Sequence, residues 1–376
     1  MRVNSCGFET GDFSEVQTVQ GNVSVQSSIV KSGQYALRIF GDATHNGCCD
    51  VFALAADGTA VLANVVTSYI RFYFHYAFSL GNTNGVTVMS CRESGGTAKA
   101  TLSITRIPDG HLALSYLGGI THGTTILADN TWYCLELTIG TGTSASWELK
   151  VNGIVDMSGT NNLTANNAAL WRFGTINNYD VSVDMYYDDI AIDADAYPGP
   201  GSIVRLDPAA DVAKTNWLNQ AASSTNEFQS VAGHDTDTTY VVTSTSGTQT
   251  FTVSFPALST RQIIGTINEL KFLAWARDTG TALTSQIQVK PASNAITTIS
   301  SDVGSTYAIR SLLYKASGGT DALTIANVNT CQASIIKTQS QARELRCTCM
   351  VLMLDLPGVF SPAPNILQAV KRAAFW

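Results

Sequence analysis

Short segments in which apolar and polar residues alternate run through almost the whole chain, and this pattern constrains the fold more than any other feature. Examples are YIRFYFHYAF (69–78), KATLSITRI (99–107), TWYCLELTI (131–139) and SWELKVNGIV (146–155). A period of two places apolar side chains on one face of a β-strand, whereas a helix needs a period near 3.6. The segments recur every ~8–15 residues between Gly, Asn, Asp and Ser, as in a sandwich rather than in βαβ units. The sequence therefore predicts an all-β protein.

A segment rich in proline and glycine divides this pattern into two blocks. Tyr197–Gly201 reads YPGPG, and proline lacks the N–H that a helix interior or a central strand needs. We place a first domain at 1–196, a linker at 197–202 and a second β-sandwich domain at 203–360. The stretch 345–355 is the most apolar in the chain, so we expect it to run through the core of the second domain.

The last residues, SPAPNILQAVKRAAFW (361–376), form a short C-terminal tail with a different pattern. Asn365 can cap a short helix with one apolar side. Two aromatic residues then follow with no local core to join, so they fold back on the second domain, dock into a partner or stay disordered. The candidate partner-docking residues are Ile366, Leu367, Val370, Phe375 and Trp376.

The composition narrows the classes of function. Charged residues make up 14% of the chain, against ~25% in a typical soluble protein, so uncharged polar residues must cover the surface. The net charge of −7 predicts no nucleic-acid partner. We expect no membrane insertion and no secretory signal, because no run approaches ~20 apolar residues and MRVNSCGFETGDF lacks the signal pattern. This profile suits adhesins, lectins and virion parts.

Eight scattered cysteines, with no CxxC pair among them, predict buried free thiols rather than a zinc site. Two adjacent ones, Cys48 and Cys49, receive no role.

Several motifs of the first block resemble those of the concanavalin A-like/laminin-G-like jelly roll. The segments CGFETGDF (6–13) and KSGQYALRIF (31–40) look like the first hairpin of that family. NTWYCLELTI (130–139) and SWELKVNGIV (146–155) look like a core pair joined by a tight turn, and YYDDIAI (186–192) looks like its closing strand. The resemblance covers residues 6 to about 195 and implies a jelly-roll sandwich.

The order of both blocks resembles a two-domain class of tailed-phage virion proteins. A jelly roll ending in DDIAI, a PGPG segment, and then IVRLDPAADVAKTNW and HDTDTTYVVTSTSG follow each other as in that class. The resemblance spans nearly the full chain but departs from the class at the C-terminal tail. It implies assembly in the host cytoplasm, location on the virion and no catalytic residues.

Two adjacent carboxylates in YYDDIAI, Asp188 and Asp189, invite a catalytic or metal interpretation. Neighbours on a strand point to opposite faces, so the pair cannot share a proton or an ion unless the strand bulges there. We expect one carboxylate to accept backbone N–H groups at a sheet corner and the other to face solvent. Asp189, Asp193 and Asp195 lie at positions i, i+4 and i+6, on one side of an extended segment, which makes them candidate cation ligands. The alternative is a solvated acidic edge that discourages strand pairing.

A catalytic function finds little support in the motifs. GxSxG, HExxH and GxxxxGK[ST] are all missing from the sequence, and the five histidines lack ligand spacing. HDTDTTY (234–240) fits a turn better than a metal site. We expect neither an enzyme nor a cofactor.

Glycan binding has a stronger claim, because jelly rolls of this type often bind sugars through aromatic and amide side chains. The candidates cluster around INNYD, although Trp171 in LWRFG also fits a core position. These candidate glycan-binding residues are Trp171, Asn177, Asn178, Tyr179 and Asp180.

The sequence thus predicts a non-enzymatic structural protein on the surface of a tailed-phage virion, associated with the tail or a fibre. Its partners would be other virion proteins, from the tail or the major capsid protein, in a homo-oligomer for which the class suggests a trimer. The alternatives are a capsid decoration protein and an adhesin that binds a host surface glycan.

Overall fold

The structure is a computed structural model of the 376-residue chain. The residues that it describes are 2–52, 67–78, 85–93, 96–105, 111–116, 119–140, 142–163, 170–175, 177, 182–221, 227–232, 238–258, 267–278, 283–291, 297–303, 305–314, 323–339 and 342–358.

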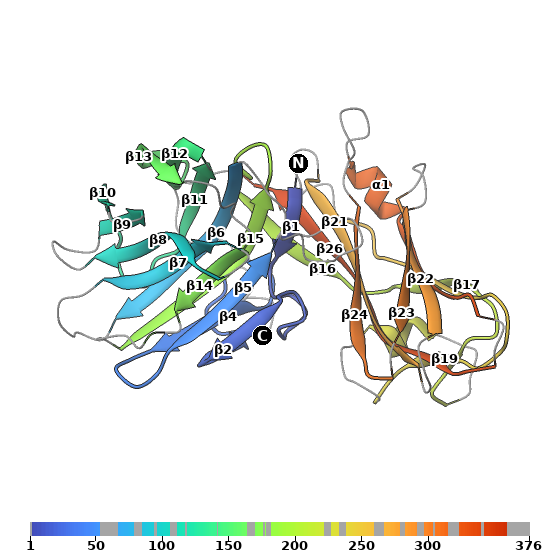
Figure 1. The fold of residues 1–376 in the computed structure, drawn as a ribbon. Coiled ribbons are helices and arrows are strands. Elements are labelled where there is room, and N and C mark those ends of the chain that lie inside the picture. Colours follow the sequence, from blue (N-terminus) through green and yellow to red (C-terminus); the bar gives the residue numbers. More distant parts are fainter. Residues whose placement is uncertain are drawn as a thin grey trace, which may run out of the picture.

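Two antiparallel sheets make up the first half of the described chain (Figure 1). Along the eight-stranded sheet lie β13 (Ile154–Leu163), β12 (Gly142–Val151), β11 (Tyr133–Gly140), β6 (Thr67–Phe78), β15 (Val183–Asp193), β4 (Ala36–Gly41) and β3 (Val23–Gln26), with β1 (Arg2–Cys6) paired to β15. Along the seven-stranded sheet lie β10 (Gly119–Ile126), β9 (His111–Tyr116), β8 (Ala98–Thr105), β7 (Val86–Arg92), β14 (Leu170–Thr175), β5 (Gly47–Phe52) and β2 (Thr18–Gly21).

The second half holds another pair of antiparallel sheets. The six-stranded sheet has the order β18 (Leu218–Asn219), β19 (Val241–Thr243), β26 (Leu345–Pro357), β21 (Glu269–Asp278) and β24 (Ala308–Tyr314), with β16 (Gly201–Leu206) paired to β26. The five-stranded sheet has the order β17 (Ala210–Lys214), β20 (Gln249–Ser254), β25 (Gln332–Lys337), β22 (Leu283–Lys290) and β23 (Thr297–Val303).

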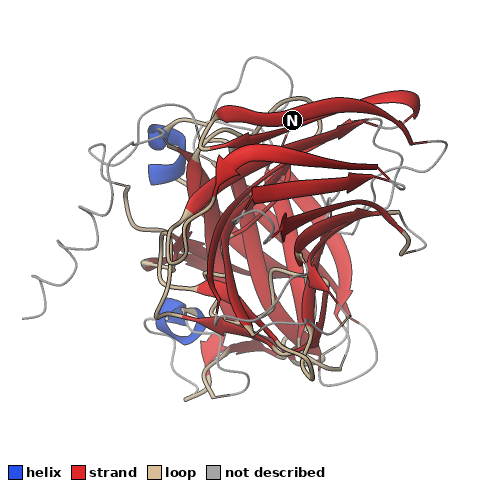
Figure 2. Ribbon diagram, turned by 90° about the vertical axis from the view of Figure 1, so that its left-hand side faces the viewer, coloured by secondary structure: helices blue, strands red, loops and turns tan. Residues whose placement is uncertain are grey.

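Helix is scarce among the described residues, as Figure 2 shows. A 3-10 turn covers Glu227–Val231, and α1 covers Ile325–Asn329. Thr324 begins α1 with a capping box, because its side chain accepts the N–H of Asn327 while the Asn327 side chain accepts the N–H of Thr324. None of the described helices is long and apolar enough to cross a membrane. The all-β prediction is confirmed.

Each pair of sheets encloses its own apolar core. In the first half, alternate residues of β6 (Ile70, Phe72, Phe74) meet Phe173 of β14 and Tyr187 of β15. Phe72 and Phe173 pack edge to face with ring centroids 5.3 Å apart, and Tyr187 closes the cluster by donating to the Val88 carbonyl. The period-two pattern therefore produces the core that it predicts.

The second core is built around β26, which is buried along most of its length. Phe251 of β20, Phe272 of β21 and Leu352 of β26 are among its fully buried members. The expectation that 345–355 runs through the core is therefore confirmed. All eight cysteines are free and buried, as the sequence predicted. The tail at 361–376, with all five candidate docking residues, lies outside the described residues.

Trp171 generates the first prediction, because only 2% of its surface is exposed within the first core. Replacing Trp171 with Ala leaves a large cavity and should lower the free energy of unfolding by about 3–5 kcal/mol. Trp171→Phe keeps most of the packing and should cost less than half as much. Guanidinium unfolding followed by circular dichroism measures both. A loss below about 1 kcal/mol for Trp171→Ala would contradict the core position.

Candidate functional site

A β-bulge in β15 explains the adjacent carboxylates. The register between β15 and β6 shifts between Asp188 and Ala191, and Asp189 has the left-handed φ of 48°. This local change lets both side chains turn inward, so Asp188 and Asp189 are 0% and 1% exposed. The expectation that one of them faces solvent is wrong.

The two carboxylates hold different parts of the chain. Asp188 accepts the N–H groups of Lys31 at 2.9 Å and Ser32 at 3.2 Å, which fixes the turn before β4. Asp189 accepts the Ser32 hydroxyl at 2.9 Å and the N–H of Ile203 at 2.6 Å. Because Ile203 lies on β16, Asp189 ties the first sandwich to the first strand of the second.

Arg71 of β6 lies at the centre of the junction between the two halves and is fully buried. Its Nε donates to the Asp189 carbonyl at 3.1 Å, its Nη1 to the Gly199 carbonyl at 3.0 Å and its Nη2 to Asp355 Oδ1 at 3.3 Å. Burial alone would lower the pKa of Arg71, but the Asp355 charge raises it. The guanidinium therefore stays charged although it is fully buried.

Asp355 of β26 also forms an ion pair with Arg2, whose Nη1 lies 2.5 Å from Asp355 Oδ2. Two guanidinium groups and two carboxylates thus meet between the sheets, all at most 5% exposed. We call Arg2, Arg71, Asp189 and Asp355 the interdomain ion cluster. Its opposite charges balance, which a buried group of this kind requires.

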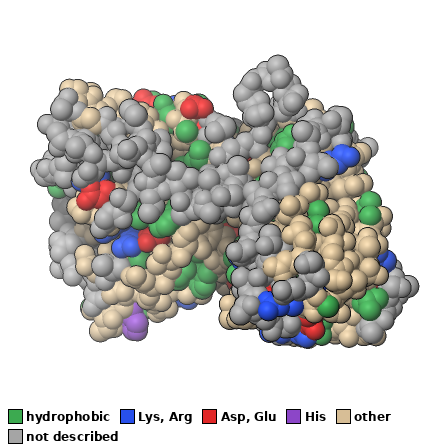
Figure 3. All heavy atoms as spheres, turned by 45° about the vertical axis from the view of Figure 1, so that its right-hand side comes forward, with side chains coloured by type: hydrophobic (Ala, Val, Ile, Leu, Met, Phe, Trp, Pro, Cys, Tyr) green, Lys and Arg blue, Asp and Glu red, His purple; other side chains and the backbone are tan. Residues whose placement is uncertain are grey.

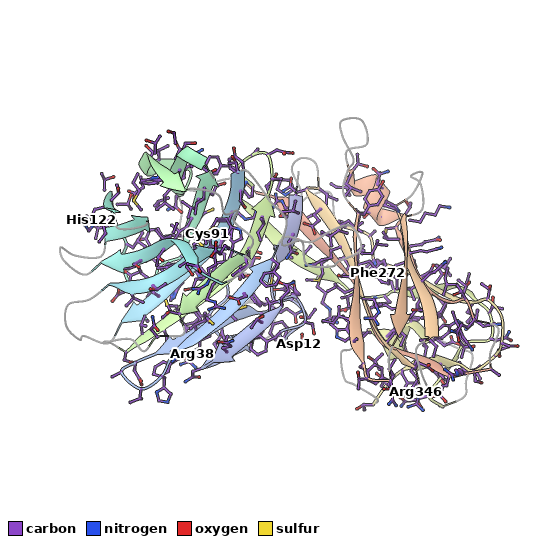
Figure 4. All side chains as sticks on the ribbon, viewed as in Figure 1. Asp12, Arg38, Cys91, His122, Phe272 and Arg346 are labelled. Carbon is purple, nitrogen blue, oxygen red and sulfur yellow. The ribbon has the colours of Figure 1, made fainter. Side chains whose placement is uncertain are left out.

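The N-terminal segment fills the junction beside this cluster, as the central position of β1 in Figure 1 shows. Lys271 of β21 is 1% exposed and donates to the Asn4 side chain and the Ser5 carbonyl. Asp12, labelled in Figure 4, lies on the side of the first domain that faces the second. At Gly7 a Cβ would come within 2.8 Å of the Ile203 side chain, so only glycine fits this approach.

The Pro-Gly segment is bonded to the first domain rather than suspended between the two. The Tyr197 hydroxyl donates to Glu148 at 3.0 Å, and the Lys150 ammonium lies 3.7 Å from the centre of the Tyr197 ring. Gly199 donates its N–H to Glu136 at 2.8 Å. The linker predicted at 197–202 overlaps β16, which begins at Gly201.

A buried carboxyl group lies near the same junction. Glu9 accepts the N–H groups of Gln34 at 3.0 Å and Tyr35 at 3.2 Å, but burial raises its pKa to about 8. Burial likewise raises the pKa of Asp188 well above its usual value. It raises the pKa of Asp189 less, because Arg71 and the Ile203 N–H favour the ionised form.

The candidate cation ligands do not converge. Asp189 is bonded as above, Asp193 lies 3.7 Å from Arg2 Nε, and the exposed Asp195 donates its own N–H to Asp193. Within the described ranges, no group of three His, Cys, Asp or Glu residues is arranged to hold a metal. His234, Asp235 and Asp237 lie outside those ranges.

The candidate glycan residues have different outcomes. Trp171 is a core residue, so its place in the predicted site is wrong: its ring packs inside the sandwich. Asn177 is exposed. Asn178, Tyr179 and Asp180 lie outside the residues that the structure describes.

Sequence reasoning missed a charged group on the outer face of the seven-stranded sheet. Arg172 of β14 binds Asp50 of β5 through two bonds, Nε to Oδ1 at 2.6 Å and Nη2 to Oδ2 at 2.7 Å. Arg92 of β7 lies diagonally across from Arg172 on the same face. The available signal was the alternation in LWRFG, where Arg172 must point away from the buried Trp171 and Phe173.

No protein-family model matches the sequence, and no curated protein matches it. Among solved structures, a cellulose-induced protein is 15% identical with a TM-score of 0.40, covering 52% of this chain and 99% of that one. An endo-β-1,4-glucuronan lyase from the fungus Trichoderma reesei is 13% identical with a TM-score of 0.40, covering 51% and 95%. A carbohydrate esterase from Shiga toxin-encoding bacteriophage phi24B is 17% identical with a TM-score of 0.40, covering 52% and 99%. Likenesses of this size say nothing about function.

The interdomain ion cluster predicts a large effect of a single substitution. Asp355→Ala leaves Arg71 and Arg2 buried without their shared carboxylate and should lower the free energy of unfolding by about 3–5 kcal/mol. The matched control is Asp184→Ala, which breaks the Arg38–Asp184 pair, whose side chains are 38% and 29% exposed. That change should cost less than about 1 kcal/mol. Urea unfolding compares them, and equal losses would contradict a special role for Asp355.

The raised pKa of Glu9 predicts that the free energy of unfolding depends on pH. Because its pKa is raised to about 8, its protonated form favours the folded state. This contribution is complete below about pH 4.3, the unfolded value, and is lost as the pH rises through 8. Glu9→Gln, which stays neutral, should therefore flatten the fall in unfolding free energy between pH 5 and 8, by up to about 1.4 kcal/mol per pH unit. Asp184→Asn serves as the control, and a slope unchanged by Glu9→Gln would contradict the assignment.

Proposed function

We propose that this chain is a non-enzymatic structural protein of a tailed-phage particle, exposed on its surface and associated with the tail or a fibre. The observation that carries the proposal is the interdomain ion cluster, which links the two β-sandwiches through buried charges. A particle component must keep its shape under load, and a junction made of fully buried Arg71 and Asp355 resists hinge motion. The sequence resemblance to virion proteins supports the same conclusion.

The surface composition fits this role. Figure 3 shows one face of the molecule, and among the described residues on it uncharged side chains outnumber charged ones. Such a surface suits a protein that stands among copies of itself and other particle proteins. In this proposal the partners are tail or major capsid proteins, and assembly is symmetric, with a trimer as the first expectation.

Mass spectrometry and electron microscopy of purified particles test the proposal. Particles from the phage that encodes this chain should contain it in a fixed, symmetric copy number. Particles grown without its gene should take up the purified protein in the same number. Its absence from purified particles, or uptake in variable amounts, would contradict a structural role.

A version that ends at Ser361 locates the attachment surface. If the five apolar residues of the tail anchor the protein, the shortened version should fail to bind particles while its melting temperature stays unchanged. If both versions bind alike, the attachment surface lies on a sandwich, and the tail hypothesis is wrong. Labelling by electron microscopy separates attachment at the tail from decoration of the capsid.

A further inference from the structure

The outer face of the seven-stranded sheet carries more positive than negative charge. Asp50, Arg172 and Ser90 are cross-strand neighbours on β5, β14 and β7, and Arg92 lies two residues beyond Ser90 on the same face. The intervening residues point into the core; these are Val51, Trp171 and Cys91. We call Asp50, Ser90, Arg92 and Arg172 the arginine face.

The charges on this face do not balance. The Arg172 guanidinium donates two hydrogen bonds to the Asp50 carboxylate, and both are shorter than 2.8 Å. The Nε of Arg92 is buried and has no hydrogen-bond partner among the described residues. Burial and the neighbouring Arg172 lower the pKa of Arg92, although the group stays charged at neutral pH. Two guanidinium groups against one carboxylate leave one positive charge without a partner, and a half-buried guanidinium favours an anion there.

Hydroxyl groups extend the arginine face on both sides. Thr18 of β2 pairs with Asp50, and Thr101 of β8 pairs with Ser90, so a polar row crosses five neighbouring strands. At the usual strand spacing the row is about 19 Å long. Both threonines are partly exposed, whereas Asp50 and Ser90 between them are each only 3% exposed. A row of this length, with hydroxyls and one charge, fits an extended polar ligand better than a single small ion.

We propose that the arginine face binds an acidic glycan. The guanidinium of Arg92 would donate two hydrogen bonds to a sugar carboxylate, because the two groups match in planar, two-bonded geometry. The partly exposed hydroxyls of Thr18 and Thr101 bond the neighbouring sugar hydroxyls. A nucleic acid is disfavoured, since it needs several free cations and the chain carries a net charge of −7. This inference does not depend on the particle role proposed above.

Calorimetric titration at low salt and pH 7 tests whether the protein recognises the carboxylate of an acidic sugar. The probes are tetramers of galacturonic acid and of hyaluronan, and sialyllactose, each compared with its methyl ester. The full-length protein should bind at least one acid about tenfold more tightly than its ester. If every acid binds no more tightly than its ester, or no probe binds, the proposal is wrong. This comparison needs no variant and is unaffected by any loss of folding.

Variants then test Arg92 itself. Arg92→Gln should weaken binding of the acid to the level of its ester. Asp50→Asn removes the negative charge that pairs with Arg172, so it should tighten binding of the acid. Arg38→Gln on the other sheet is the matched control, because Arg38 is engaged by Asp184, and should change nothing. Melting temperatures check that each variant is folded. A folded Arg92→Gln that binds like the original protein would overturn the assignment to this face.

Discussion

The contact between Arg71 and Asp355 is the constraint on which the two-domain arrangement depends. A guanidinium in β6 and a carboxylate in β26 are 284 positions apart in sequence and fully buried against each other. Burying either of these charges without the other would cost several kcal/mol. Each half of the molecule therefore needs the other in order to bury its own polar groups.

Local backbone features make this contact possible. The bulge in β15 turns the Asp189 carbonyl toward Arg71 and its carboxylate toward the Ile203 N–H. At Gly201 a Cβ would lie 2.4 Å from Arg71 Nη1 and 2.6 Å from the Leu356 carbonyl. Glycine is needed there because the backbone runs against a buried side chain, and the resulting segment is held rather than free to hinge.

The sequence predicts the strands well because alternation records burial directly. It places the core strand at 345–355, the buried thiols and the tight turn at Asn152, whose φ is 50°. The alternation of apolar and polar residues predicts neither the bulge at Asp189 nor the burial of both Asp188 and Asp189, because a one-residue shift in register leaves no mark in that pattern. The pairs Arg71–Asp355 and Arg172–Asp50 join distant strands, so only the fold reveals them. Trp171 shows the converse: an aromatic residue beside a polar loop fits a binding site and a core equally until the faces are known.

Differential scanning calorimetry of the intact protein tests most directly whether the two sandwiches form one body. If the interdomain ion cluster couples them, the protein should unfold in a single transition whose calorimetric enthalpy equals its van't Hoff enthalpy. Two separable transitions, or a calorimetric enthalpy about twice the van't Hoff value, would show that the domains unfold independently and would contradict the account.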